Sequence, residues 1–215
     1  MFSSIVIDDL NARFPSLGVA WLYSDYRNES DQTLVNILGS FIHQFLMSSA
    51  FPHIPATLLT SLEEIRNKGK SLEATDALDM LKNILQELEG SFICIDALDE
   101  LEPNIRRQLL EKLKELATHT SNRHRLFLTG REHIKSEVYR KFKIPSKYEV
   151  EIIASPDDVR RFLLNELVED TNPDAMDTPL HDEIVKSLIE RSQGMYVVRN
   201  SSRACIYIYI LSSSP

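Results

Sequence analysis

Three acidic residues follow a short apolar segment in the middle of the chain. Residues 92–95 are Phe, Ile, Cys and Ile, and the acids are Asp96, Asp99 and Glu100. Such a run is typical of a strand buried on both faces of a parallel sheet, and carboxylates at its end are costly unless a cation or strong donors meet them. Ligands of open α/β sheets bind at this edge. We therefore predict a Mg²⁺–nucleotide site, where Asp96 reaches the ion through water and Asp99 and Glu100 orient or polarise an attacking water.

Strands and helices must alternate to position these residues. Apolar runs predict strands at 19–23, 91–95, 125–129 and 148–153, the last nearer an edge of the sheet. Helical periodicity predicts helices over 2–13, 34–46, 56–66, 72–88 and from Pro103 onward. This alternation indicates an α/β fold with a parallel sheet flanked by helices. We expect a core over 1–154, a helical segment over 155–198 and an atypical tail over 199–215.

The helical segment has a clear start and an apolar face. Ser155, Pro156 and two acids suit an N-cap and first turn. Val159, Phe162, Leu163 and Leu167 are predicted to form the buried face, and a further helix carries Ile184 to Ile189.

Composition narrows the function classes. The 215 residues carry a net charge of −8, which argues against a nucleic-acid partner held by phosphate contacts. Two cysteines form no disulfide framework, and the six histidines show no metal-ligand spacing. No targeting segment is visible, and the apolar run 204–211 is shorter than the about 20 residues that span a bilayer. We expect a soluble cytoplasmic protein with no membrane partner.

The apolar run with Asp-Ala-Leu-Asp-Glu at 96–100 resembles the Walker B motif of NACHT-type P-loop NTPases. These are signalling ATPases or GTPases of the STAND class, and the chain resembles the nephrocystin-like NACHT domains common in fungal signalling proteins. The resemblance covers roughly residues 2–198. It implies that the four predicted strands are the second to fifth of a sheet ordered 5-1-4-3-2.

A second motif supports this resemblance. The strand at 125–129 runs into Thr129-Gly130-Arg131, which resembles the family's Thr-Ser-Arg-like sensor motif. The resemblance implies that Arg131 contacts the γ-phosphate of the nucleotide. A guanidinium can bind phosphate oxygens bidentately, which agrees with a contact between Arg131 and the γ-phosphate.

The phosphate-binding loop of this family, G-x-x-x-x-G-K-[ST], is absent from the sequence. Gly69-Lys70-Ser71 imitates its end, but Glu64 occupies the place of the first glycine, and we predict an ordinary loop there. The helix at 2–13 resembles the one that follows the P-loop. We therefore expect an N-terminally truncated domain that lacks the first strand and the Gly-rich loop, about twenty residues.

These observations predict a fragment of a NACHT-domain signalling NTPase, an ATP- or GTP-dependent conformational switch that is inactive as given. The intact family member would use Mg²⁺ and ATP or GTP and would self-associate through its NACHT domain; this chain is expected to bind no cofactor stably. Two alternatives remain open: a non-catalytic NACHT-like interaction protein, and a fragment of a AAA+-like P-loop ATPase.

The sheet and the tail carry a prediction about stability. In the family's order the missing strand lies between 125–129 and 148–153, so we expect two unpaired strand edges there. The tail alternates Ile and Tyr without charge over 206–210, which adds an aggregation-prone segment. Its residues 199–215 resemble translated non-coding sequence, with a genuine terminal strand as the alternative.

Overall fold

The computed structural model describes residues 2–28, 30–50, 56–67, 69, 71–119, 123–145, 148–152, 156–168, 183, 186–187 and 206–212. The chain divides into two compact units, one formed by residues 1–150 with 208–215 and the other by residues 151–207. Each unit is treated by itself below. Among the described helices, none has the length and apolar character needed to cross a membrane.

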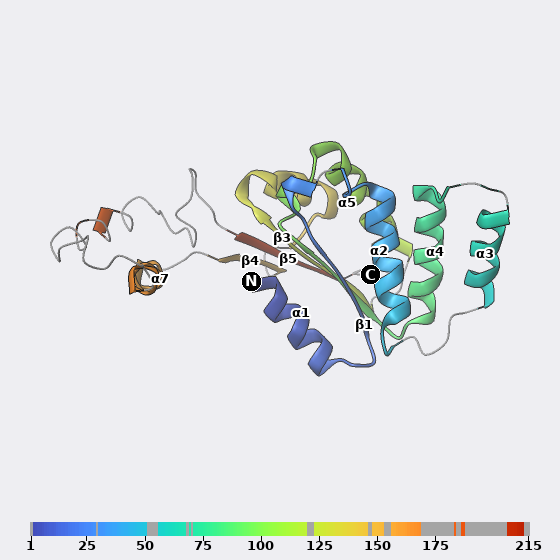
Figure 1. Cartoon of the computed structure of the whole chain (residues 1–215), viewed down its shortest axis with the longest axis horizontal. Coiled ribbons are helices and arrows are strands. Elements are labelled where there is room, and N and C mark those ends of the chain that lie inside the picture. Colours follow the sequence, from blue (N-terminus) through green and yellow to red (C-terminus); the bar gives the residue numbers. More distant parts are fainter. Residues whose placement is uncertain are drawn as a thin grey trace. The chain divides into compact units, whose positions relative to one another are not determined.

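The first unit is built on a parallel sheet, as the alternating pattern predicts. Strand β1 (Gly18–Tyr23) pairs in parallel with β2 (Ser91–Asp96), which pairs in parallel with β3 (His124–Arg131). The register sets Tyr23 opposite Asp96 and Ile95 opposite Leu128. The strand order is β1-β2-β3-β5-β4, with β4 (Glu149–Ile152) at the edge and β5 (Ile206–Ser212) inside it (Figure 1).

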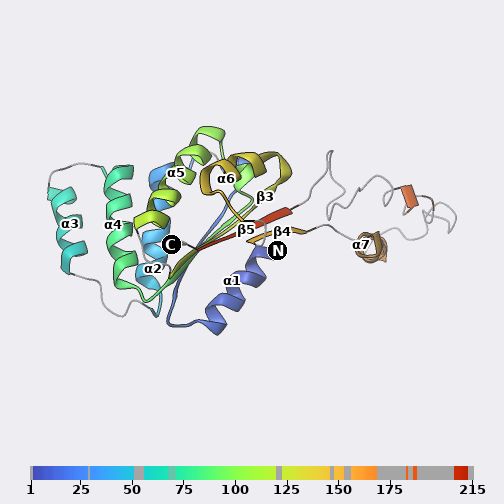
Figure 2. The same ribbon diagram turned by 180° about the vertical axis from the view of Figure 1, so that it is seen from behind.

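Helices flank this sheet, which confirms the predicted fold class. They are α1 (Phe2–Arg13), α2 (Leu34–Met47), α3 (Ala56–Asn67), α4 (Ala74–Glu87), α5 (Pro103–His119) and α6 (Lys135–Phe142). Helix α1 lies on one side of the sheet and α2 on the other, with α4 beyond α2 and α3 outermost (Figures 1 and 2). The second unit contains α7 (Pro156–Val168).

Apolar helix faces form the core against the strands. Helix α2 buries Leu34, Ile37, Leu38, Phe41, Ile42 and Phe45, and α4 buries Ala77, Leu78, Met80, Leu81, Ile84 and Leu85. Thr33 begins α2 by accepting the backbone N–H of Asn36 at 3.3 Å, which satisfies one free donor of the first turn. Gly18 lets β1 approach this layer, because a Cβ there would meet Phe45 Cδ1 at 2.8 Å.

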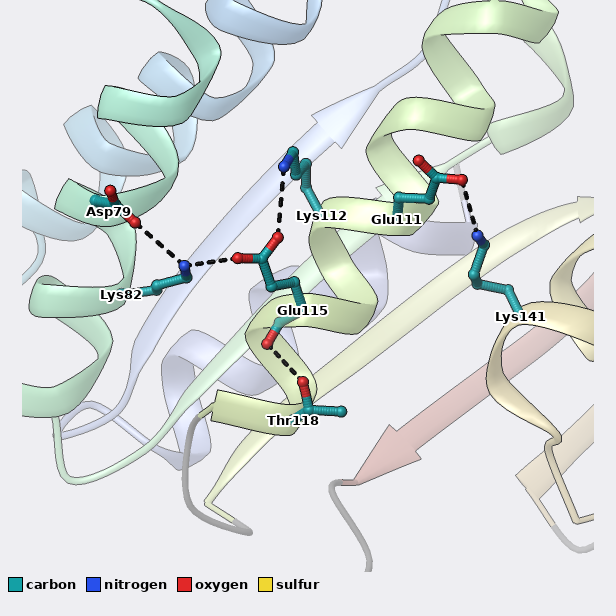
Figure 3. A network of polar contacts seen from close by, with 7 residues as sticks. All are labelled: Asp79, Lys82, Glu111, Lys112, Glu115, Thr118 and Lys141. Atoms are coloured by element: carbon teal, nitrogen blue, oxygen red, sulfur yellow. Dashed lines mark hydrogen bonds and ion pairs between the residues drawn. The ribbon is translucent and has the colours of Figure 1, made fainter.

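Ion pairs connect the outer helices of the first unit (Figure 3). Lys82 of α4 contacts Glu115 of α5 at 2.7 Å and Asp79 of its own helix at 3.1 Å. Lys112 reaches Glu115 at 3.4 Å, while Lys141 of α6 reaches Glu111 of α5 at 3.1 Å. The Lys82 side chain is only 14% exposed, so the contact between Lys82 and Glu115 is the most shielded of these ion pairs.

Several predictions need correction. The tail forms β5 between β3 and β4, so the expected pair of open strand edges is wrong for this structure. The sequence pattern missed α6, and Phe162, predicted buried, is 41% exposed.

Other predictions fall on residues that the structure leaves undescribed. These are the cap at Ser155, the side chains of Val159, Leu163 and Leu167, and most of the helix from Ile184 to Ile189.

Candidate functional site

Asp96 ends β2 and is held by two hydroxyl groups. The Ser3 hydroxyl, in the first turn of α1, donates to Asp96 Oδ1. The Thr129 hydroxyl, in β3, donates to the same oxygen at 2.7 Å. Both hydroxyl residues are buried, with exposures of 2% each. The carboxylate is thus fixed at the carboxyl edge of the sheet, with both bonds on a single oxygen.

The turn after Asp96 has an unusual backbone. Ala97 adopts φ 52 and ψ 48, the left-handed region that non-glycine residues occupy at a cost. Its N–H donates to the Thr129 hydroxyl at 2.9 Å. Thr129 therefore ties together the conformation of this turn and the position of the Asp96 carboxylate.

Asp99 pairs with Arg131. The carboxylate of Asp99 lies in the short helix η2 (Leu98–Glu100), is 4% exposed, and contacts Arg131 Nε at 3.3 Å. It also accepts the Arg131 backbone N–H at 3.2 Å. Gly130 lies beside this pair, and a Cβ there would make only an ordinary contact with Asp99 Oδ1 at 3.5 Å but would lie 2.4 Å from Ile134 Cδ1.

Glu100 is the more accessible of the two adjacent acids. Its side chain is 24% exposed and lies 3.6 Å from the Arg131 guanidinium. Partial burial, and then the charge of Asp99, raise the pKa of Glu100 above its ordinary value, while Arg131 and the Tyr26 backbone N–H oppose that rise. A carboxylate with a raised pKa accepts a proton more readily, which suits a general base.

Arg106 of α5 holds the backbone of this loop. Its guanidinium is 12% exposed and pairs with Glu137 of α6 at 3.0 Å. It also donates to the carbonyl oxygens of Asp99 and Leu101 at 3.4 and 3.1 Å. The two acids thus sit on a segment fixed by a largely shielded cation rather than on a free turn.

The structure brings the four predicted site residues to the ends of two neighbouring strands. Arg131 joins Asp99 and Glu100, whereas Asp96 is bound separately by Ser3 and Thr129. These contacts give the positions of the residues and leave their chemical roles as predictions. Over the described residues, no group of three or more His, Cys, Asp or Glu side chains could hold a metal. A cation at Asp96 would need further oxygen ligands from water or a phosphate.

Sequence reasoning missed Ser3 and Ser24 as members of this site, and it named Thr129 only as part of the motif that ends in Arg131. Ser24 follows β1, and its backbone N–H donates to the Asp96 carbonyl oxygen at 3.1 Å. Its hydroxyl is the one buried side-chain polar atom without a partner in the part of the chain that the structure describes. A polar residue at the carboxyl end of each of two paired strands, Ser24 after β1 and Asp96 as the last residue of β2, was the available signal for Ser24, since parallel strands end at the same edge.

The Gly69-Lys70-Ser71 segment lies apart from these strand ends in the sequence. Gly69 forms a turn at φ +60 after α3, and Lys70 is outside the described residues. Because the segment follows a helix, it lacks the strand that precedes a phosphate-binding loop.

Comparison with known proteins gives a family match. Residues 1–131 match the family described as "Nephrocystin 3, N-terminal". That range includes Ser3, Ser24, Asp96, Thr129 and Arg131. Neither a curated protein nor a solved structure matches the chain.

Proposed function

Since the chain belongs to the nephrocystin 3 N-terminal family, we propose that it carries the Walker B and sensor part of a NACHT-type nucleotide switch. The proposal rests mainly on one observation, the Asp96 carboxylate fixed at the carboxyl edge of the sheet by Ser3 and Thr129. Ligands of open α/β sheets bind at this edge.

The oxygen-rich surroundings of Asp96 fit Mg²⁺. Both described hydrogen bonds to its carboxylate end on Oδ1, and the unpartnered Ser24 hydroxyl belongs to the residue that follows the adjacent strand. Mg²⁺ prefers oxygen ligands and keeps several of its waters. Such an ion would neutralise negative charge on the phosphates of ATP or GTP.

Glu100 and Asp99 would have different roles because their side chains differ in exposure. Glu100, with its raised pKa, is suited to orient and deprotonate water. Asp99 is nearly buried against Arg131, so it would position the guanidinium that meets the γ-phosphate. In this proposal Asp99 acts through Arg131.

A second candidate is a non-catalytic NACHT-like interaction protein. It is favoured by the fact that the acids and Arg131 already satisfy one another within the chain. Under either candidate, self-association through this domain is a further proposal.

Isothermal titration with Mg-ATP and Mg-GTP distinguishes the candidates. We expect no micromolar binding by the chain as given, because no loop and lysine hold the phosphates. A strand followed by G-x-x-x-x-G-K-T, joined before Phe2, should produce binding at least about tenfold tighter, a difference of about 1.4 kcal/mol. Micromolar binding by the unextended chain would contradict the prediction that binding requires a Gly-rich loop and its lysine to hold the phosphates.

Variants of the extended chain then test each role. Asp96→Asn should weaken binding in Mg²⁺ but leave binding in EDTA unchanged, whereas Glu100→Gln should slow hydrolysis and spare binding. Glu111→Gln, on the exposed face of α5, is the matched control. If the extended chain folds and still binds neither nucleotide, the hypothesis of a non-catalytic interaction protein is favoured.

A further inference from the structure

Strand β1 lies at one end of the strand order, beside β2. Its residues 18–23 read Gly-Val-Ala-Trp-Leu-Tyr and include neither a charged residue nor a proline. Charged side chains and prolines are common devices that stop an exposed strand edge from pairing with another chain. The outer edge of β1 is therefore open to pairing unless another part of the chain covers it.

The direction of the backbone groups shows which residues of β1 face this outer edge. In a parallel strand the N–H and C=O of one residue point to one neighbour, and those of the next residue point the other way. The N–H of Gly18 donates to the Gly90 carbonyl before β2 at 3.1 Å, so Val19, Trp21 and Tyr23 face outward. Val19 is 3% exposed and Tyr23 is 44% exposed. Trp21 and Tyr23 thus form the accessible part of the edge.

The side-chain amide of Gln44, in α2, occupies the backbone groups of Trp21. Its Oε1 accepts the Trp21 N–H at 2.9 Å, and its Nε2 donates to the Trp21 carbonyl oxygen at 2.9 Å. A neighbouring strand would bond both of these groups in the same way. Nε2 also donates to the hydroxyl of Ser40, one turn earlier in α2, at 2.9 Å. Three hydrogen bonds thus hold the amide in one orientation against the edge.

We propose that Gln44 guards the edge of β1: its amide takes the place of a strand at Trp21 and keeps the chain from pairing through β1 with a second copy of itself. A second copy is the partner that fits, because two identical strands can pair around a two-fold axis and neither carries a charge that would repel the other. Without the amide, Trp21 and Tyr23 would both present backbone groups that such pairing satisfies. This inference does not depend on nucleotide binding.

Sedimentation velocity of Gln44→Met tests this role. Methionine is similar in length to glutamine but neither donates to nor accepts from the Trp21 backbone. We expect Gln44→Met to self-associate at least about tenfold more tightly than the unmodified chain. His43→Met is the matched control, because it places the same apolar side chain at the neighbouring exposed position of α2 and leaves Gln44 in place. Equal association of the two variants would overturn the proposal.

Two further variants test whether the edge itself is the contact. Gln44→Glu keeps an acceptor for the Trp21 N–H and adds a charge at the edge, so it should associate no more than the unmodified chain. Tyr23→Pro removes an outward-facing donor, which an edge strand tolerates, and it should reverse the association when it is added to Gln44→Met. Association that persists in this double variant would show that the copies meet elsewhere and would overturn the proposal.

Amide hydrogen exchange at Trp21 reports the pairing at a single group. In the unmodified chain this amide should exchange at least about a hundredfold more slowly than in the unfolded chain. In Gln44→Met it should exchange fast in dilute solution and slowly at concentrations where the copies associate.

Two outcomes of the exchange measurement would contradict the proposal. Exchange of the Trp21 amide at the unfolded rate in the unmodified chain would show that Gln44 does not cap it, and this measurement decides even where Gln44→Met fails to fold. Fast exchange in associated Gln44→Met would show that the second copy does not pair with β1.

Discussion

Thr129 connects two strand ends through one hydroxyl group. It donates to Asp96 and accepts from the N–H of Ala97, whose backbone is left-handed. Removing this hydroxyl would leave the Ala97 N–H without its acceptor and would leave Asp96 Oδ1 with one described donor, the Ser3 hydroxyl. Groups of this kind cost more when unpaired than they contribute when paired.

Thr129→Val should therefore destabilise the fold by about 1–3 kcal/mol, although valine keeps the volume of threonine. Urea denaturation followed by circular dichroism measures this change. Thr118→Val removes an exposed hydroxyl that donates to the Glu115 carbonyl, and it should cost less than about 0.5 kcal/mol. Equal effects of the two substitutions would mean that the Thr129 contacts stabilise the fold no more than the exposed hydrogen bond of Thr118.

Glu100 and Glu102 should respond to pH in opposite ways. Burial and Asp99 raise the pKa of Glu100 in the folded state. The favourable contribution of Glu100 to the free energy of unfolding is therefore present at low pH and is lost as pH rises. Glu100→Gln should thus be more stable than the unmodified chain at about pH 7 and equal to it at about pH 3.

Glu102 provides the control of opposite sign. The N–H groups of Asn104 and Ile105 lower the pKa of Glu102, so its contribution is present at neutral pH and is lost as pH falls. Glu102→Gln should destabilise at about pH 7, with the difference vanishing at about pH 3. Urea midpoints at both pH values check both substitutions, and the same sign for both would contradict this assignment.

At the scale of elements, β3 meets the short helix η3 (Glu132–Ile134) at Gly130. A Cβ at residue 130 would lie 2.4 Å from Ile134 Cδ1, and Ile134 is itself buried with 1% exposure. The neighbouring side chain has little room to move away. The glycine therefore sets how closely β3 and η3 pack.

Gly130→Ala should destabilise the chain by about 1–3 kcal/mol through overpacking. Gly39→Ala in α2 is the matched control, because a Cβ there meets nothing within 4 Å. That substitution should stabilise by about 0.5–1 kcal/mol, since alanine favours helices. Thermal melts of the two variants should move in opposite directions, and a shift in the same direction would contradict this account.

The contact between α4 and α5 depends on Lys82. Lys82→Met should cost about 1 kcal/mol, because the shielded ammonium contacts both Glu115 and Asp79. Lys112→Met, whose 3.4 Å contact with Glu115 is longer, should cost clearly less. The difference between the two should shrink in 1 M salt, where the screening length is about 3 Å. Urea denaturation at low and high salt measures it.

Individual elements were predictable where local patterns decide them. The runs at 91–95 and 125–129 gave buried strands, and the spacing of Leu78, Leu81 and Leu85 gave the buried face of α4. Helix α6 was missed because Lys135–Phe142 buries only Val138 among the residues described for it, too few for a visible period. Phe162 was placed in a core by its spacing, yet spacing does not say whether another element covers a helix face.

The candidate site was predictable in part for the same reason. Asp96, Asp99, Glu100 and Arg131 follow strands and could be read from the sequence. The link from Thr129 to Asp96 depends on the register that sets Ile95 opposite Leu128. Ser3 reaches Asp96 across a separation of 93 residues in the sequence. Such long-range pairings arise from packing and leave no local signal.

At the scale of the whole molecule, Cys94 reports on the integrity of the sheet. It lies in β2 between β1 and β3 with 1% exposure, and burial raises the pKa of its thiol to about 12. Thiol reagents attack the thiolate. A reaction with Cys94 therefore requires the sheet to open.

In a Cys205→Ser chain, labelling of Cys94 by a thiol reagent should be slow in buffer. It should accelerate with urea in parallel with the loss of circular dichroism, because both follow the same opening. The denatured chain in high urea gives the reference rate. Fast labelling that does not depend on urea would show that Cys94 is accessible without unfolding.

The insertion of β5 between β3 and β4 has a consequence for synthesis on the ribosome. The chain emerges from its N-terminus, so β1 to β4 leave the ribosome before residues 206–212 exist. At about 5–20 residues per second, residues 153–205 delay β5 by roughly 3–10 s. During that interval the nascent sheet exposes strand edges that chaperones bind. We expect nascent chains halted at residue 205 to recruit such chaperones longer than full-length released chains.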